Sequence, residues 1–136
     1  MLGDKLGEET GKVTGRRILE GDDFRYVKME ISFETQATIL GVQGMNVGTY
    51  TVFERIPGQL YGEGQGIFMT MDGDGAIWNG HGVGRMVENG AMLFAFSATF
   101  QTDSEKLKRL NNVLVVGEHR AEMDGSYKTT SSEWKC

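Results

Sequence analysis

The chain has 136 residues and a formal net charge of -5, and 39% of its residues are hydrophobic and 24% charged. This length suits one globular domain with a sizeable core and leaves no room for a second. The acidic balance opposes the phosphate backbone of nucleic acids, and no apolar run approaches the roughly 18 residues that a membrane span needs. We therefore expect neither nucleic acid nor a membrane as a partner.

The spacing of cysteine, histidine and carboxylate residues argues against a cofactor. Cys136 is the single cysteine, which rules out an intramolecular disulfide and suits the reducing cytoplasm. Residues 72–75, Asp-Gly-Asp-Gly, resemble the start of a calcium loop, but Ala76 occupies the next ligand position. The glycine repeats lack the lysine of a phosphate-binding loop. We expect a cytoplasmic protein with no metal and no cofactor.

Apolar and polar residues alternate along most of the chain, which is the period of a β-strand. Residues 1–10 are polar, and we expect them to form a flexible N-terminus ahead of a single β-barrel domain over residues 11–136. The pattern predicts strands over residues 12–19, 26–35, 46–55, 61–71, 76–87, 91–102, 113–123 and 126–134, with residues 37–42 either continuing the second strand or forming another. One short helix is predicted over residues 104–110, before the last hairpin, because Asp103 or Ser104 can cap it.

Alternating glycines mark the two strands around residues 72–75. They are Gly62, Gly64 and Gly66 before the turn, and Gly80, Gly82 and Gly84 after it. Glycine weakens an ordinary strand, so we expect these positions to relieve crowding at a sharp bend or beneath large side chains. Many short antiparallel strands joined by tight turns favour an up-and-down barrel, which leaves no sheet edge exposed. We predict an all-β protein, a closed antiparallel β-barrel of eight or nine strands.

This organisation resembles a known group of proteins. The segments that carry the resemblance are residues 60–66 and 78–85 with the Asp-Gly turn between them, then residues 100–102 and 107–111 before a closing hairpin. Over about residues 10 to 135 they look like the small calycin-like barrels of the allene oxide cyclase and dirigent type and their uncharacterised prokaryotic relatives. The resemblance implies a barrel that holds an apolar small molecule, a homodimer or homotrimer, and in some members cyclisation without a cofactor.

The pairing of the two glycine-rich strands decides which side chains face the lumen. If a four-residue turn pairs Met71 with Ala76, Glu63 lies opposite Gly84 on a face that forms a pocket wall. That face carries Tyr61, Glu63, Gln65, Ile67, Met69 and Met71. A turn with one residue more or fewer would instead place Glu63 on the same face as His81 or Arg85. Both registers remain open at this point.

The candidate catalytic residues are Glu63, His119 and Tyr61. Burial would raise the pKa of Glu63 into the range of a general acid or base, whereas an outward Glu63 would be an ordinary surface carboxylate. His119 follows the apolar alternation of residues 113–123 and is expected to point inward. It is then a proton shuttle, a hydrogen-bond donor to a ligand, or a core histidine with local hydrogen bonds.

The candidate ligand-binding residues are Gln65, Met69, Trp78, His81, Arg85, Phe94 and Phe96. Their aromatic members, together with Tyr50 and Trp134, suit either a flat apolar ligand or a plain core. Arg85 can recognise a ligand carboxylate through two parallel hydrogen bonds, or it lies in solvent at the rim.

Three functions fit this pattern. The first, which the apolar alternation favours, is a container that binds a small apolar molecule in the lumen. The second is a cofactor-free isomerase or cyclase that uses an acid or base in the lumen. The third is a barrel filled by its own side chains that acts as a structural or interaction protein. Apolar residues on both faces of residues 91–102 also favour a partner that covers the outside of the barrel.

Overall fold

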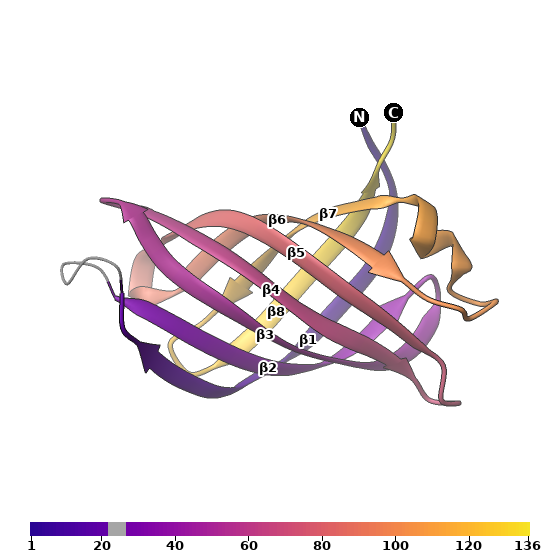
Figure 1. The fold of residues 1–136 in the computed structure, drawn as a ribbon, viewed down its shortest axis with the longest axis horizontal. Coiled ribbons are helices and arrows are strands. Elements are labelled where there is room, and N and C mark those ends of the chain that lie inside the picture. Colours follow the sequence, from indigo (N-terminus) through magenta and orange to yellow (C-terminus); the bar gives the residue numbers. More distant parts are fainter. Residues whose placement is uncertain (22–26) are drawn as a thin grey trace.

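The computed structural model describes residues 1–21 and 27–136, and its strands close into one barrel (Figure 1). Within these residues the strands are β1 (Leu2–Leu19), β2 (Lys28–Ile39), β3 (Val42–Ile56), β4 (Gln59–Thr70), β5 (Gly75–Met86), β6 (Met92–Gln101), β7 (Leu114–Ala121) and β8 (Ser126–Trp134). Each strand pairs antiparallel with the next, and β8 pairs with β1 to complete the ring. The predicted closed, all-β, up-and-down barrel is confirmed.

The N-terminal segment is part of the barrel wall. Residues 1–10, predicted as a flexible N-terminus, lie almost entirely in β1, which pairs with β2 from Gly7 onward and with β8 from Leu2 onward. Residues 37–39 continue β2 without a break, and Leu40 and Gly41, both with positive φ, turn the chain into β3. The predicted start of the second strand at Tyr26 lies outside the described residues.

The short helix predicted over residues 104–110 is present before the last hairpin as a 3₁₀ helix that lies a few residues further along the chain. Turns followed by a 3₁₀ helix, η2 (Lys108–Asn112), occupy this region. Leu107 N donates to Ser104 O at 3.3 Å and Leu110 N donates to Leu107 O at 2.9 Å, which are the three-residue steps of 3₁₀ geometry. So short a segment does not nucleate an α-helix by itself. The Ser104 hydroxyl, expected to cap the helix, donates instead to Asp74 Oδ2 at 2.8 Å.

The pairing of β4 with β5 differs from the four-residue-turn register. Glu63 lies opposite His81 and not opposite Gly84, while Phe68 lies opposite Ala76. This is the second of the two registers considered above, in which Glu63 and His81 share one face. Both side chains are exposed, so that shared face is the outer one.

The hydrogen bonds of the β4–β5 turn explain this register. Thr70 N donates to Asp74 O at 2.9 Å, and the Thr70 hydroxyl accepts the Asp74 N–H at 3.0 Å. These bonds end the ladder before Met71, which is 84% exposed. The even-numbered residues of β4 and β5 therefore face the lumen, and the predicted pocket wall faces outward.

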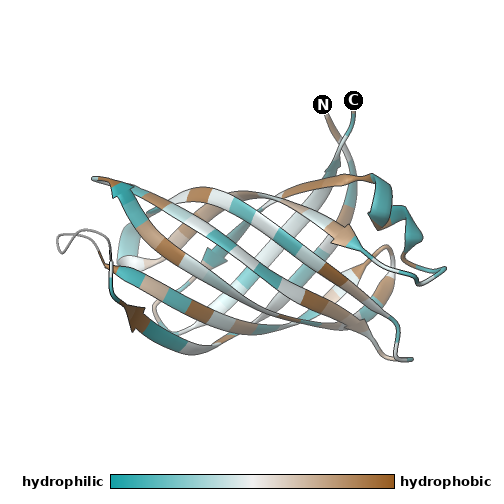
Figure 2. Ribbon diagram, in the orientation of Figure 1, coloured by the Kyte–Doolittle hydropathy of each residue, from teal (hydrophilic) through white to brown (hydrophobic). Residues whose placement is uncertain are grey.

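Inward side chains pack into two clusters toward the two ends of the barrel. The aliphatic cluster contains Leu6, Ala37, Ile39, Phe68, Ala76, Ala98, Leu107, Leu110 and Val115. The aromatic cluster contains Ile31, Phe33, Tyr50, Val52, Phe94, Ala121 and Tyr127. Figure 2 shows the same alternation from outside, as hydrophobic and hydrophilic residues that follow one another along the strands.

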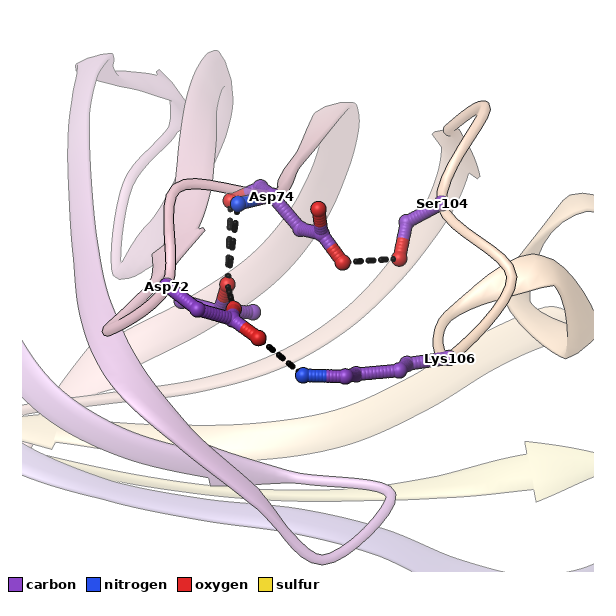
Figure 3. Close-up of polar contacts among 5 residues, drawn as sticks. Asp72, Asp74, Ser104 and Lys106 are labelled. Atoms are coloured by element: carbon purple, nitrogen blue, oxygen red, sulfur yellow. Dashed lines mark hydrogen bonds and ion pairs between the residues drawn. The ribbon is translucent and has the colours of Figure 1, made fainter.

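The segment over residues 102–113 lies at the same end of the barrel as the β4–β5 turn (Figure 1). Its Leu107 and Leu110 belong to the aliphatic cluster and are 0% and 1% exposed. Two polar contacts join it to the turn: Lys106 pairs with Asp72, and Ser104 donates to Asp74 (Figure 3). The Lys106 ammonium lowers the pKa of Asp72 to about 2. This segment therefore closes one end of the barrel.

Candidate functional site

The lumen contains one cavity of about 90 Å³ that borders both clusters. That volume holds a few water molecules and is well below the roughly 300 Å³ of an ordinary ligand pocket. Its aromatic walls include Phe33, Tyr50, Trp78, Phe94, Phe96 and Tyr127, and its polar side chains include Glu9, Asn46, His119 and Thr129. Most of the bore is thus filled by side chains, and the space that remains is apolar with a few polar groups.

Glu9 is the centre of a buried hydrogen-bond network. The Thr35 hydroxyl donates to Glu9 Oε1 at 2.7 Å, and Asn46 Nδ2 donates to the same oxygen at 2.9 Å. Trp78 Nε1 donates to Asn46 Oδ1 at 2.8 Å, which fixes the orientation of the Asn46 amide. The network joins β1, β2, β3 and β5 across the lumen.

Three other buried polar atoms have no hydrogen-bond partner among the described residues. They are the Tyr50 hydroxyl, His119 Nε2 and the Thr129 hydroxyl. Aromatic rings surround His119, with centroid distances of 4.9 Å to Phe94, 5.1 Å to Tyr127 and 5.6 Å to Tyr50. Buried polar groups in folded proteins are almost always hydrogen-bonded, so unpaired ones at a cavity wall indicate a place for a bound molecule or water.

The strand register places Glu9, Thr129 and His119 in one row across three neighbouring strands. Glu9 on β1 lies opposite Thr129 on β8, and Thr129 lies opposite His119 on β7. Neighbouring strands are about 4.8 Å apart, so the Cα atoms of Glu9 and His119 are roughly 10 Å apart. Both side chains point into the concave lumen, which brings their ends closer than their backbones.

Burial shifts the pKa values in this row in opposite directions. Loss of hydration lowers the pKa of His119 to about 4, so its imidazole is neutral at pH 7. Loss of hydration also raises the pKa of Glu9, partly opposed by the hydrogen bonds from Asn46 and Thr35. The pKa values of the Tyr50 and Tyr127 hydroxyls are raised by burial as well, so both stay protonated. The cavity disfavours charge on every one of these groups.

Four of the predicted site residues line this cavity with side chains that face the lumen. They are His119, Trp78, Phe94 and Phe96. Space for the rings comes from inward glycines: a Cβ on Gly66 or Gly48 would stand 2.5 or 2.7 Å from the Trp78 ring. Large side chains therefore do lie over these glycines, and a residue with a side chain at either position would displace the indole.

The other predicted site residues lie on the outer face of the barrel. Glu63, Gln65, His81 and Arg85 are exposed, Met69 is 40% exposed, and Tyr61 is half-buried on the same outer face. Tyr61 donates to Glu63 Oε2 at 3.0 Å and lies beneath the Arg55 guanidinium, 4.3 Å from its ring centroid. The backbones of Glu63 and His81 border the cavity because the inward glycines beside them leave the main chain uncovered.

The sequence interpretation missed Glu9, Asn46, Thr129 and Tyr127. Glu9 lies in the polar segment that was expected to be flexible, although Gly7, Glu9, Gly11 and Val13 repeat at period two into the predicted first strand. Extending the strand by this period would have placed Glu9 on the lumen face. Trp134, considered as a cavity residue, is 48% exposed.

Comparisons with solved structures show the fold. A protein of unknown function from Clostridium acetobutylicum superposes with a TM-score of 0.82 at 15% sequence identity, over 98% of both chains. A β-barrel-like protein from Acinetobacter baumannii superposes with a TM-score of 0.81 at 14% identity, over 99% of this chain and 96% of that one. A protein described as an enzyme, from Penicillium herquei, superposes with a TM-score of 0.69 at 16% identity, over 96% and 92%.

Sequence comparison adds no family. No family model matches the chain, and no curated protein sequence matches it. The structural likeness, at such low identity, extends to the barrel, while the allene oxide cyclase and dirigent type stays a prediction. Within residues 1–21 and 27–136, no helix has the length and apolar character to cross a membrane. The cytoplasmic location and the homodimer or homotrimer also stay predictions.

Proposed function

We propose that this protein binds a compact, neutral, largely apolar molecule in the lumen of its barrel. The observation that carries the proposal is a pair of buried polar atoms without partners at the cavity wall, the Tyr50 hydroxyl and His119 Nε2. Each such atom costs roughly 1–3 kcal/mol while it is unpaired. A ligand oxygen that meets these atoms removes that cost, and the aromatic walls supply the apolar contact.

The surroundings of the cavity favour a neutral ligand. Its described lining contains no lysine or arginine, and His119, the histidine whose side chain faces the cavity, is neutral at pH 7 because burial lowers its pKa to about 4. A carboxylate or phosphate would be buried there without a compensating charge, which is strongly unfavourable. The small volume favours a molecule of few heavy atoms, or a larger one that displaces an aromatic side chain.

Titration of the ¹⁵N-labelled protein with 2-pentanone and with butyrate, followed by NMR, tests this proposal. The two probes have equal numbers of heavy atoms and differ in charge. We expect 2-pentanone to shift the amide signals of Gly62, Gly80 and His119, with a dissociation constant on the order of 1 mM for so small a probe. Butyrate should leave those signals in place at the same concentration.

The two histidines of the chain provide a matched control. His119→Leu removes a polar atom from the cavity wall and should weaken 2-pentanone binding several-fold. His81→Leu changes the exposed histidine on the outer face and should leave binding unchanged.

The small cavity volume also favours the filled, structural barrel as a second candidate function. If 2-pentanone shifts no lumen signal in the unmodified protein, the filled barrel is correct and binding is excluded.

A further inference from the structure

We propose that Glu9 is a proton-transfer residue, and that the neutral molecules bound in the lumen are carbonyl compounds from whose α-carbon it removes a proton. This inference rests on the proposed function, because the substrate must first occupy the same cavity. It assigns a class of reaction to the cavity, proton transfer at the α-carbon of a carbonyl compound, and it identifies one carboxyl oxygen of Glu9 as the reactive atom.

The hydrogen bonds of Glu9 leave one of its carboxyl oxygens, Oε2, available to give or take a proton. Both donors, the Thr35 hydroxyl and Asn46 Nδ2, end on Oε1, so the two lone pairs of that oxygen are engaged. No side chain among the described residues donates to Oε2. A proton on this carboxyl group therefore resides on Oε2, which is the atom that gives and takes it.

A second layer of contacts holds the carboxyl group in place. Asn46 is 5% exposed, and its amide oxygen accepts the Trp78 Nε1–H at 2.8 Å. Thr35 is 2% exposed, and its hydroxyl is 2.7 Å from Glu9 Oε1. These donors come from three different strands, so the position of Glu9 is fixed by the barrel wall and not by a loop.

Tyr50 and His119 can hold the oxygen of the substrate. Both line the same cavity as Glu9, and the Tyr50 hydroxyl and His119 Nε2 are buried without partners among the described residues. The Tyr50 hydroxyl is a neutral donor, and burial raises its pKa above the ordinary value. His119 donates to the same oxygen in the tautomer that carries its proton on Nε2. Neutral donors suit a carbonyl oxygen that gains negative charge during the reaction.

The environment of Glu9 suits a base that works near neutral pH. Burial raises its pKa from 4.5, and a carboxylate with a raised pKa is a stronger base. The groups that face it are Thr35 on β2, Asn46 on β3, and Tyr127 and Thr129 on β8, while Tyr50 on β3 lines the same cavity. His119, farther along the row, is already neutral above about pH 5 because its pKa is about 4. Glu9 is thus the group in the cavity whose carboxylate form is made more basic by its surroundings.

The proposed step conserves atoms and electrons. Glu9 Oε2 forms a bond to the α-proton, and the electrons of the broken C–H bond form a C=C double bond while the carbonyl π pair moves to the oxygen. The resulting enolate oxygen is held by Tyr50 and His119. Reprotonation of the same carbon gives exchange once the proton on Glu9 has been replaced by one from solvent, and transfer of the proton to a conjugated carbon gives isomerisation. No oxidant, reductant or cofactor takes part in either outcome.

Exchange of the α-protons of 2-pentanone in D₂O, followed by ¹H NMR, tests this step on the full chain. We expect the protein to accelerate exchange above the buffer rate, and the acceleration to rise with pH as Glu9 ionises. Glu9→Gln keeps the shape and removes the base, so it should reduce the acceleration by about a hundredfold or more. Glu34→Gln, which changes an exposed carboxylate on β2 that is not among the residues lining the cavity, should leave it unchanged.

Binding and exchange are measured in the same samples, which separates the two proposals. Retained 2-pentanone binding in Glu9→Gln shows that the variant is folded, and Glu9→Asp provides a second variant whose shortened carboxylate should lower the rate. If 2-pentanone binds in the lumen and no exchange above buffer occurs, or if Glu9→Gln exchanges as fast as the unmodified protein, the role of Glu9 is wrong and the binding function stands. If 2-pentanone does not bind, both proposals fail.

Discussion

The two ends of the barrel bury their side chains in different ways. At the end closed by residues 102–113, Leu107 and Leu110 are 0% and 1% exposed and belong to the aliphatic cluster. Toward the other end, the Tyr50 hydroxyl and His119 Nε2 are just as inaccessible, yet they have no hydrogen-bond partner among the described residues. The first arrangement gains hydrophobic stabilisation without loss, whereas the second leaves a desolvation cost in the folded state.

This difference indicates where function should be sought. A side chain that only fills space can be apolar, and the closed end uses leucine and alanine for that purpose. The unpaired polar groups at the aromatic end lower the stability of the fold, so packing does not explain their presence and a functional role does. Perturbed pKa values in a cavity are also typical of binding and catalytic sites. The contrast predicts that substitutions at the closed end change stability alone, and that substitutions at the aromatic end change stability and ligand response together.

The largest effect is expected at the closed end. Leu107→Ala removes a fully buried side chain and should lower the free energy of unfolding by about 2–5 kcal/mol. Urea denaturation measures this loss, and Leu114→Ala, at a position that is 42% exposed, should change it by less than about 0.5 kcal/mol. Equal losses in the two variants would mean that residues 102–113 do not close the barrel.

The fold was predictable because its signals are local and repeated. Period-two alternation and the turn residues between strands place most of the elements within a few positions, and inward glycines beneath Trp78, Phe94 and Phe96 account for part of the high glycine content. The register of β4 against β5 was harder, because the hydrogen bonds between Thr70 and Asp74 end the ladder one step before Met71. One such turn moves Glu63 from the predicted lumen to the outer face.

A pH effect of intermediate size is expected at the aromatic end. His119 has a pKa of about 4 when folded and 6.5 as its ordinary value, so the unfolded chain binds a proton more readily below pH 6.5. Stability that is present above pH 6.5 is then lost as the pH falls to 4, by about 3 kcal/mol from this group. Urea denaturation of the protein and of His119→Leu across this range measures the difference.

Two other groups sharpen this pH experiment. The raised pKa of Glu9 acts with the opposite sign, because stability falls as the pH rises above 4.5 and the buried carboxyl group ionises. Glu9→Gln should remove that decline. His81→Leu, at an exposed position, should lose stability in acid as the unmodified protein does. An acid profile of His119→Leu that coincides with that of the unmodified protein would exclude a buried neutral histidine.

The candidate site was only partly predictable. His119 was placed correctly on the inward face because residues 113–123 alternate without interruption. Glu9 was not found, since a buried carboxylate resembles a surface one in a polar segment and its partners Thr35 and Asn46 are distant in sequence. Such a network forms only when β1, β2 and β3 are already side by side, which no local pattern encodes.

The smallest effect is expected from two glycines that differ in the space above them. A Cβ on Gly66 would stand 2.5 Å from both the Trp78 ring and the Val47 carbonyl oxygen, so Gly66→Ala should cost about 1–3 kcal/mol. A Cβ on Gly62 would have its nearest neighbour, a Phe94 ring carbon, at an ordinary 3.4 Å. Gly62→Ala should therefore fold with nearly unchanged stability while its methyl group narrows the cavity that Gly62 lines. Weaker 2-pentanone binding in this stable variant would separate ligand response from stability, and unchanged binding would place the ligand elsewhere.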